Sequence, residues 1–228
     1  SVYFYGLLEN SVAVFIKNPP GLNWAKLLDF GPTCTFGNPG DSIKNKEIFI
    51  FQIEALESTA IFAKHDGEFV TPFLKELADK SLFFPFCLSY HKGGNTSDAE
   101  FAIINSVEPL DEYPAMKLGE EAFKNSFIKF FNNAGFESYI FHGNQAFYFD
   151  RDKAFKKAGF QEYYDIKKMG LKQYTWGAED EEVFAFAVNK LNEQKEPFLY
   201  YLISMSSHEP YNLINIHYQN KRFDNIKD

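Results

Sequence analysis

Cysteine is scarce in this chain of 228 residues, which contains only Cys34 and Cys87. The two are too far apart to form a Cys-x-x-Cys motif, and two thiolates are too few for a four-cysteine zinc site. A dense disulfide framework is also excluded. One disulfide and two buried free thiols both stay open, so the cysteine count does not fix the compartment.

Long apolar segments and excess positive charge are missing as well. No run of about 18 apolar residues occurs, and the N-terminus lacks the basic and then apolar segments of a secretion signal. The formal net charge is −8, with Lys and Arg scattered along the chain. We therefore expect no nucleic-acid partner.

The residues that are present indicate one globular domain with a short preceding segment. Hydrophobic residues make up 45% of the chain, and 27 Phe against 2 Trp predict a phenylalanine-rich core. Residues 1–45 are punctuated by Pro and Gly and are predicted to be a lead-in or linker segment. Residues 46–228 are predicted to form the domain itself.

Strand and helix patterns alternate along this domain. The continuous apolar run Ile48 to Ile53 is typical of a strand covered on both faces. The alternation predicts an α/β fold with a largely parallel sheet and helices on both faces. Further strands are expected at 82–88, 138–141 and 197–203, and helices at 3–17, 70–77, 96–107, 118–134, 151–158 and 179–193.

Polar side chains follow the predicted strands. Ligands in parallel α/β folds bind beyond the carboxyl ends of the strands. We therefore expect the loops that carry these side chains to meet at one edge of the sheet. The loops contain Glu57, Gly93 to Thr96, His142 to Asn144, and Ser206 to His208.

Thr96 is the candidate nucleophile. Gly93-Gly94-Asn95 precedes it, so its hydroxyl can be exposed where a helix begins and where free amides face a bound anion. A threonine hydroxyl needs a metal or a base to become nucleophilic. The alternative is that Thr96 or Ser97 is only a helix cap, with nearby acids complementing the helix dipole.

Four other residues have a functional and a structural interpretation each. Glu57 suits a metal-bound carboxylate or a turn cap. Arg151 suits bidentate capture of a phosphate, or an ion pair with the acids on either side of it. His142 and His208 suit ligand contacts or ordinary hydrogen-bonded structure.

Seven short motifs occur in an order that resembles the lipoteichoic acid synthase and phosphoglycerol transferase family. The resemblance covers residues 46 to 211. The motifs are Leu56-Glu57-Ser58-Thr59, Val70-Thr71-Pro72-Phe73-Leu74, Gly94 to Phe101 with Asn105-Ser106, Phe141-His142-Gly143-Asn144, Asp150-Arg151-Asp152, Trp176-Gly177 and Ser206 to Tyr211.

The resemblance implies an alkaline phosphatase and sulfatase superfamily fold and a covalent transfer mechanism. It implies that Thr96 attacks phosphatidylglycerol or a related lipid, holds the glycerophosphate, and passes it to a glycan or polyol-phosphate acceptor. It also implies that Glu57 and Thr96 bind Mn²⁺ or Mg²⁺. The resemblance thus implies a metal-dependent transferase.

The same resemblance implies a substrate-binding set. Arg151 and His208 are expected to contact the glycerophosphate, and Phe149 stands where the synthases carry a tryptophan. His142 and Asn144 complete the expected set.

The chain departs from the family at the metal site, because it contains no Asp-His dipeptide to supply the remaining ligands. We therefore expect the N-terminal part of a catalytic domain, inactive alone and without a tightly held metal. The resemblance further implies an extracytoplasmic domain anchored by preceding membrane helices, which favours a Cys34 to Cys87 disulfide.

Three alternatives stay open: a sulfatase-like phosphodiesterase, a phosphoethanolamine transferase, and a non-catalytic anion-binding domain. The chain lacks a Cys/Ser-x-Pro-x-Arg pattern at Thr96, which disfavours a true sulfatase.

Overall fold

A four-stranded sheet in the order β1-β6-β4-β5 organises the described part of the chain. The computed structural model describes residues 47–84, 91–174, 176–194 and 197–209. All neighbouring strands pair in parallel, which confirms the predicted sheet type. The strands are β1 (Glu47–Gln52), β4 (Glu137–His142), β5 (Glu162–Tyr164) and β6 (Phe198–Ile203).

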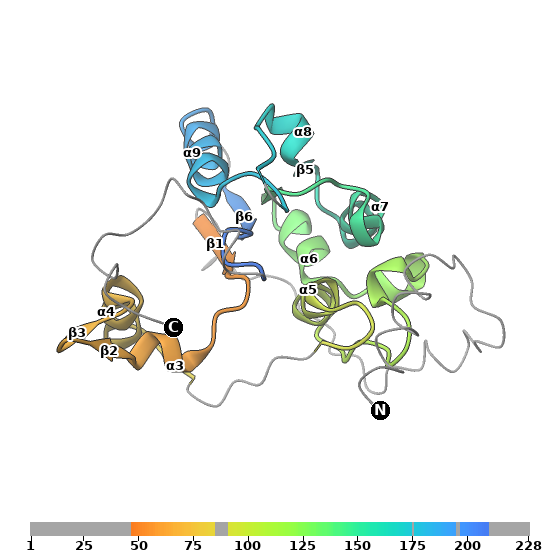
Figure 1. Ribbon diagram of the computed structural model, residues 1–228. Helices are drawn as coiled ribbons and strands as arrows, with labels where there is room; N and C mark the ends of the chain where they lie inside the picture. The colour runs from red at the N-terminus through yellow and green to blue at the C-terminus, as the bar shows by residue number, and fades with distance from the viewer. Residues whose placement is uncertain (1–46, 85–90, 175, 195–196, 210–228) are drawn as a thin grey trace.

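Helices cover both faces of this sheet (Figure 1). One face packs against α5 (Thr96–Asn105), α6 (Phe127–Asn133) and α7 (Arg151–Ala158). The other packs against α8 (Ile166–Met169) and α9 (Asp180–Leu191). The predicted α/β architecture with helices on both faces is therefore confirmed.

The central strand β6 explains why two cores form. Every residue of β6 is buried, and successive side chains point to opposite faces. Leu199 and Tyr201 enter the core under α5 and α7, whereas Tyr200 and Leu202 enter the core under α9. Burying a large apolar side chain of this kind stabilises the fold by about 1.5–3 kcal/mol.

The strand β1 is confirmed, but the expectation that both of its faces are covered is wrong for the described structure. Phe49 is 40% exposed and Phe51 is 57% exposed. The reason is position: β1 is the edge strand of the described sheet and pairs on one side with β6. A continuous apolar run does not distinguish an edge strand from a central one.

A small lobe follows β1 and lies apart from the sheet in Figure 1. Its hairpin turns at Asp66 and Gly67, whose φ angles of 50° and 85° suit the left-handed turn that twisted strands require. Thr71 and Pro72 begin the last helix as predicted, although the Thr71 hydroxyl donates to the Ala60 carbonyl at 3.0 Å. The lobe comprises α3 (Ser58–Phe62), β2 (Lys64–His65), β3 (Glu68–Phe69) and α4 (Pro72–Lys80).

The helix predicted at 118–134 is divided into shorter pieces. Gly119 is extended, with φ −69° and ψ 176°, so the range begins with a non-helical residue, and within it η3 (Glu120–Phe123) ends before α6 begins. The short helix η2 (Ala115–Lys117) precedes the range. Ser126 then caps α6 by accepting a hydrogen bond from the Ile128 amide. The pattern of apolar residues at 118–134 indicates a helix, but such a pattern does not show where the helix is interrupted.

Other expectations fall partly or wholly outside the described residues. Residues 82–84 form no strand, and 85–88 are not described. The helix at 3–17, the lead-in at 1–45, Cys34 and Cys87 also lie outside the described part.

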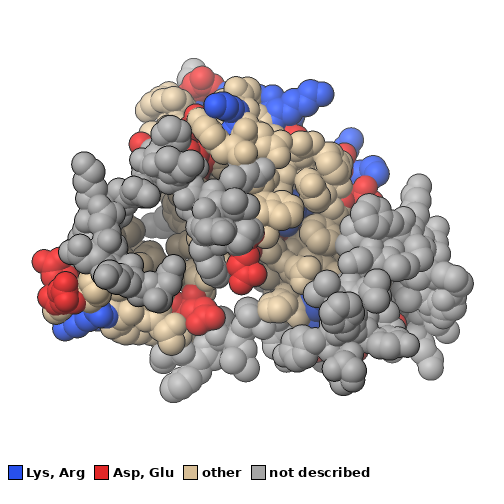
Figure 2. Space-filling view, viewed as in Figure 1, with Lys and Arg blue, Asp and Glu red and all other residues tan. Residues whose placement is uncertain are grey.

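Charged side chains are spread over the face shown in Figure 2, where Lys and Arg lie among Asp and Glu. Within the described ranges, no helix has both the length and the apolar composition needed to cross a membrane.

Candidate functional site

The turn before Thr96 is held in a conformation that suits few residues. Asn95 has φ 48° and ψ −127°, a region that strongly favours glycine. At Gly94, an added Cβ would lie 2.2 Å from Asp98 Oδ1. The glycine is therefore required by close packing, and the strained residue directly precedes the candidate nucleophile.

Asp98 organises this turn from inside the fold. Its Oδ2 accepts hydrogen bonds from the amides of Gly94 at 2.7 Å and Lys92 at 3.1 Å, and its Oδ1 accepts one from Ala115 at 2.9 Å. Burial raises the pKa of Asp98 above its usual range despite these hydrogen bonds, which act to lower it. Asp98 is therefore a structural residue of the site.

Thr96 is half-buried at the first position of α5, and its hydroxyl contacts a carboxylate. Thr96 Oγ1 lies 3.1 and 3.2 Å from the two carboxylate oxygens of Glu54. Glu54 is two residues beyond the end of β1. The pair unites a hydroxyl with an acceptor that can take its proton or share a cation with it.

The carboxylate contact expected of Glu57 is thus made by Glu54. Glu57 is exposed at the N-cap position of α3, and its Oε2 accepts a hydrogen bond from the Thr59 hydroxyl at 3.2 Å. No contact among the described residues joins Glu57 to Thr96. The signal that identifies Glu54 is its place as the first polar residue after the Ile48 to Ile53 run.

The loop after β6 holds the backbone of Glu54. The Glu54 amide donates to Ser204 Oγ at 2.8 Å, and Ser207 Oγ donates to the Glu54 carbonyl at 2.5 Å. The parallel register places Gln52 beside Ile203, so the segments that follow β1 and β6 leave the sheet side by side. The adjacent carboxyl ends of β1 and β6 therefore fix the backbone from which the Glu54 side chain extends to Thr96.

Asp180, at the start of α9, holds this same loop. Its carboxylate accepts hydrogen bonds from the amides of Met205 at 2.6 Å and Ser206 at 3.1 Å. Burial raises the pKa of Asp180, while these hydrogen bonds act in the opposite direction. Sequence reasoning missed Asp180, whose only signal was its place in the first turn of a predicted helix.

Arg151 is buried and paired with Glu100 of α5. Arg151 Nη2 lies 2.6 Å from Glu100 Oε1, and Arg151 Nε lies 2.8 Å from Oε2. The two side chains are 5% and 0% exposed. Burial acts to lower the pKa of Arg151, but the charge and hydrogen bonds of Glu100 together raise it above its ordinary value. The ion pair considered for Arg151 therefore exists, with a partner distant in sequence.

Phe149 lies beside the guanidinium, with its ring centroid 5.5 Å from Arg151 Cζ. Phe149 and Asp150 have φ angles of 56° and 53°, and such left-handed conformations are strained for residues other than glycine. The backbone therefore bends sharply to begin α7 at Arg151.

His142 is buried at the carboxyl end of β4. The Ile203 carbonyl can only accept, so His142 Nδ1 donates to it, at 3.1 Å. Burial lowers the pKa of His142 to about 3, and the charges of Arg151 and His208 act in the same direction. The imidazole is therefore neutral at neutral pH.

His208 and Asn144 occupy different surroundings. The half-buried His208 ring lies 5.0 Å from the Trp176 ring, and its Nδ1 donates to the Glu209 carbonyl at 2.6 Å. Trp176 is 43% exposed, so it is a surface residue rather than a core one. Asn144 is buried, and its Oδ1 accepts a hydrogen bond from the Gln145 amide at 2.7 Å.

The described residues supply only part of a metal site. Glu54 and Thr96 provide a carboxylate and a hydroxyl, which suit a hard cation, but such cations take about six or more oxygen ligands. The described ranges contain no group of three His, Cys, Asp or Glu side chains that could hold a metal ion.

The chain also matches the model of a known protein family. This model, named Sulfatase, covers residues 46–227, so the chain belongs to the sulfatase family. A protein in the alkaline phosphatase superfamily from Vibrio parahaemolyticus shares the fold with a TM-score of 0.59 and 21% identity, over 86% of this chain and 52% of that one.

Within this family the chain is similar to lipoteichoic acid synthases, which confirms the resemblance seen in the motifs. It is 31% identical over 182 residues to lipoteichoic acid synthase 1 of Bacillus subtilis (strain 168), covering 75% of this chain but only 28% of that relative. The crystal structure of the lipoteichoic acid synthase LtaP from Listeria monocytogenes matches with a TM-score of 0.71 and 26% identity, over 82% of this chain and 48% of that one.

Removing one partner of the Glu100 and Arg151 pair should cost more than removing both charges. We expect Arg151→Met to lower the free energy of unfolding by about 3–5 kcal/mol, because Glu100 is left buried without compensation. The double variant Glu100→Gln with Arg151→Met should lose less. Chemical denaturation measures both.

The matched control is Lys153→Met, which removes an exposed ammonium that pairs with Asp150 at 3.0 Å. It should change the unfolding free energy much less. Equal stability of the single and double variants at the buried pair would contradict the interpretation.

His142 should make stability depend on pH. Its pKa is lowered on folding, so its contribution is present above about 6.5 and is lost as the pH falls toward about 3. The fall in unfolding free energy from pH 7 to pH 5 should be about 1–2 kcal/mol smaller in His142→Asn. Urea unfolding at both pH values tests this, with His65→Asn as control. An unchanged pH dependence in His142→Asn would refute it.

Proposed function

We propose that this chain carries the nucleophile of a phosphoglycerol transferase. The observation that carries the proposal is the contact of Thr96 Oγ1 with the Glu54 carboxylate at 3.1 Å, at the N-terminus of α5 and beside the carboxyl end of β1. A hydroxyl that faces a carboxylate and begins a helix is suited to attack a phosphorus centre. The sulfatase-family match and the similarity to lipoteichoic acid synthases support this choice.

The proposed reaction has two displacements. Thr96 Oγ forms a bond to the phosphorus of a phosphatidylglycerol-type lipid, and the bond from phosphorus to the diacylglycerol oxygen breaks. The Thr96 proton passes to Glu54 or to water, and the leaving diacylglycerol oxygen gains a proton. An acceptor hydroxyl oxygen then attacks the phosphorus of the glycerophosphoryl group on Thr96, and the bond from phosphorus to Thr96 Oγ breaks. The acceptor's proton passes to Thr96 Oγ, directly or through Glu54 or water, which restores the Thr96 hydroxyl.

A divalent cation, Mn²⁺ or Mg²⁺, fits the oxygen donors of Glu54 and Thr96. When bound, it would supply positive charge that stabilises the ionised hydroxyl and the phosphoryl oxygens. We assign to Glu54 the ligand role that the motifs had suggested for Glu57. The remaining ligands would come from residues other than those described.

The substrate-binding set is proposed around the buried charge of Arg151. Its hydrogen bonds to Glu100 use Nε and Nη2, and a guanidinium has further N–H donors on Nη1. The Phe149 ring lies beside the Arg151 guanidinium. We propose that Arg151 and His208 hold the glycerophosphate, and that Phe149, His142 and Asn144 shape the site around it.

We further propose that the donor is a membrane lipid and the acceptor a glycan or polyol-phosphate chain of the cell envelope. The full-length protein would hold this domain outside the cytoplasmic membrane through membrane helices. The support is the similarity to lipoteichoic acid synthases, of which the chain spans about 28% of the length.

Thr96→Ala should reduce diacylglycerol release from phosphatidylglycerol by at least about a thousandfold, because the attacking hydroxyl is lost. The measurement uses the full-length protein with Mn²⁺ and follows the lipid product. Thr96→Ser, which keeps a hydroxyl, should retain measurable turnover. The unfolding free energy of Thr96→Ala should change by less than about 1 kcal/mol.

Mass spectrometry of the reacted protein should show one glycerophosphoryl group on the peptide that contains Thr96. Full activity in Thr96→Ala would eliminate Thr96 as the nucleophile. Water rather than a polyol as the final acceptor would indicate a phosphodiesterase. Binding of glycerophosphate without an adduct or turnover would indicate a non-catalytic anion-binding domain.

The two candidate carboxylates can be separated by a matched pair of variants. Glu54→Gln should lower the transfer rate by about a hundredfold or more, because the neutral amide neither accepts the Thr96 proton nor binds a cation well. Glu57→Gln should leave the rate within about twofold, since Glu57 contacts Thr59 rather than Thr96. The opposite ranking would return the role to Glu57.

A further inference from the structure

Asp180 and Ser206 join the start of α9 to the loop that follows β6. The Asp180 amide donates to Ser206 Oγ at 3.0 Å, and Asp180 Oδ2 accepts a hydrogen bond from the Ser206 amide at 3.1 Å. Asp180 Oδ1 accepts a third hydrogen bond, from the Met205 amide at 2.6 Å. We call these three hydrogen bonds the Asp180 clasp. Because the clasp uses both carboxylate oxygens, it fixes two successive residues of the loop.

Two serines on either side of the clasped residues hold the backbone of Glu54. Ser204 Oγ accepts a hydrogen bond from the Glu54 amide at 2.8 Å, and Ser207 Oγ donates one to the Glu54 carbonyl at 2.5 Å. The two residues that the clasp holds lie between these serines in the chain. A displacement of the loop would therefore move both supports of Glu54 at once.

The charge of Asp180 opposes its place near Glu54. Burial is the largest cause that raises the pKa of Asp180, and the charge of Glu54 acts in the same direction. The two carboxylates therefore disfavour each other, whereas the hydrogen bonds of the clasp stabilise the ionised Asp180. Asp180 thus supports Glu54 through the loop between them and not through direct attraction.

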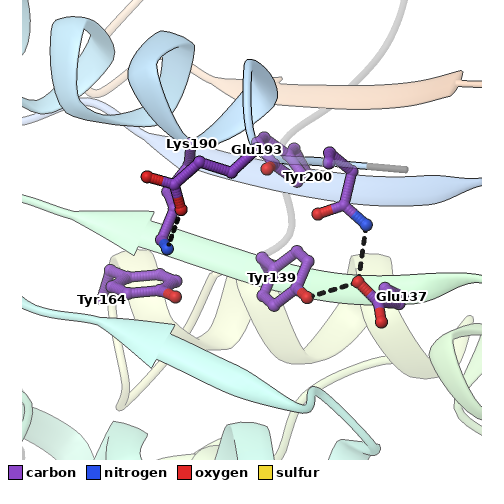
Figure 3. Close-up of a pocket in the computed structure, with 7 residues that line it drawn as sticks. Glu137, Tyr139, Tyr164, Lys190, Glu193 and Tyr200 are labelled. Atoms are coloured by element: carbon purple, nitrogen blue, oxygen red, sulfur yellow. Dashed lines mark hydrogen bonds and ion pairs between the residues drawn. The ribbon is translucent and has the colours of Figure 1, made fainter. Parts of the chain in front are cut away.

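The clasp has a rigid support in α9 and the segment before it. The Ala178 amide donates to the Gly143 carbonyl at 2.7 Å, and a Cβ added at Gly177 would lie 2.4 Å from that carbonyl oxygen. Just beyond the other end of α9, Gln194 Nε2 donates to Glu137 Oε2 at 2.5 Å, beside the cavity in Figure 3. The helix is therefore tied to the chain at both ends of β4, and the clasp starts from a fixed point.

We propose that Asp180 is a positioning residue for the attack by Thr96. Through the clasp it holds the loop after β6, and the loop holds Glu54 where its carboxylate lies 3.1 Å from Thr96 Oγ1. This inference rests on the proposed function, which assigns roles to Thr96 and Glu54. The competing explanation is that Asp180 only complements the helix dipole, as an acid in the first turn of α9.

Kinetics of the full-length protein with Mn²⁺ and phosphatidylglycerol test this role. Asp180→Ala removes both acceptors and should lower kcat for diacylglycerol release about a hundredfold, because small displacements of a catalytic group have effects of this size. Asp180→Asn keeps one acceptor and should lower kcat about tenfold. Glu181→Ala removes an exposed acid from the same helical turn and should stay within about twofold. Equal losses in Asp180→Ala and Glu181→Ala would support the helix-dipole explanation and overturn the proposal.

A double-mutant cycle shows whether Asp180 acts through Glu54. In the Glu54→Gln background, adding Asp180→Ala should lower kcat by less than about threefold, since the carboxylate that Asp180 positions is already gone. A general loss of stability would instead multiply with the effect of Glu54→Gln. A further loss of about a hundredfold in the double variant would therefore contradict the proposal.

Hydrogen exchange with mass spectrometry measures how firmly Glu54 is held, without use of the reaction. Asp180→Ala should speed amide exchange about fivefold or more in a peptide that contains Glu54, because the Ser204 acceptor of the Glu54 amide moves with the loop. The peptide that contains Thr96 should exchange as in the unaltered protein. Phe198→Leu, a core substitution at the first residue of β6, should lower the melting temperature without this selective change. Unchanged exchange at Glu54 in Asp180→Ala would overturn the proposal.

The kinetic and exchange measurements separate this inference from the proposed function. Full activity of Thr96→Ala, with faster exchange at Glu54 in Asp180→Ala, would refute the proposed function and leave the clasp supported as the element that holds Glu54. Inactive Thr96→Ala together with an unchanged kcat in Asp180→Ala would keep the proposed function and overturn the positioning role.

Discussion

The buried ion pair between Glu100 and Arg151 is the interaction on which the site depends. It joins α5, which begins at Thr96, to α7, which begins at Arg151, with an N to O distance of 2.6 Å. Burying a charged side chain costs free energy unless an oppositely charged partner compensates it. The two helices are therefore held in the relative position that keeps this ion pair intact. The charge of Arg151 also helps to keep His142 neutral, and the charge of Glu54 is one of the causes that raise the pKa of Arg151. One ion pair thus sets both the geometry and the electrostatics of this edge.

Strained backbone lies beside three of the site residues. Ala55 follows Glu54 with φ 54°, Asn95 precedes Thr96 with φ 48°, and Phe149 precedes Arg151 by two residues with φ 56°. Such conformations persist only where the surrounding structure fixes them. Here the hydrogen bonds of Asp98, the serines after β6, and the ion pair provide that support. The proposed nucleophile is therefore preorganised by interactions outside its own turn.

Much of the fold could be predicted because its signals are local. The helix at Thr96, the helix at 151–158 and the strand at 138–141 each combine an apolar period with an end signal such as Gly-Gly-Asn or Gly159. The three-residue strand β5 and the breaks around Gly119 were missed because neither has enough residues to establish a period. The exposure of β1 was missed because edge position is decided by strand order, which local pattern does not contain.

The sequence by itself determined the family and the alternating architecture, and it suggested Thr96 as the proposed nucleophile, because these rest on residue types in a fixed local order. Only the tertiary structure decided which partners the key side chains meet. It placed Glu54 rather than Glu57 against Thr96, and it paired Arg151 with Glu100 rather than with the acids beside it. The reason is that parallel strands and helix packing bring together residues distant in the chain, whereas motif spacing reports only on neighbours.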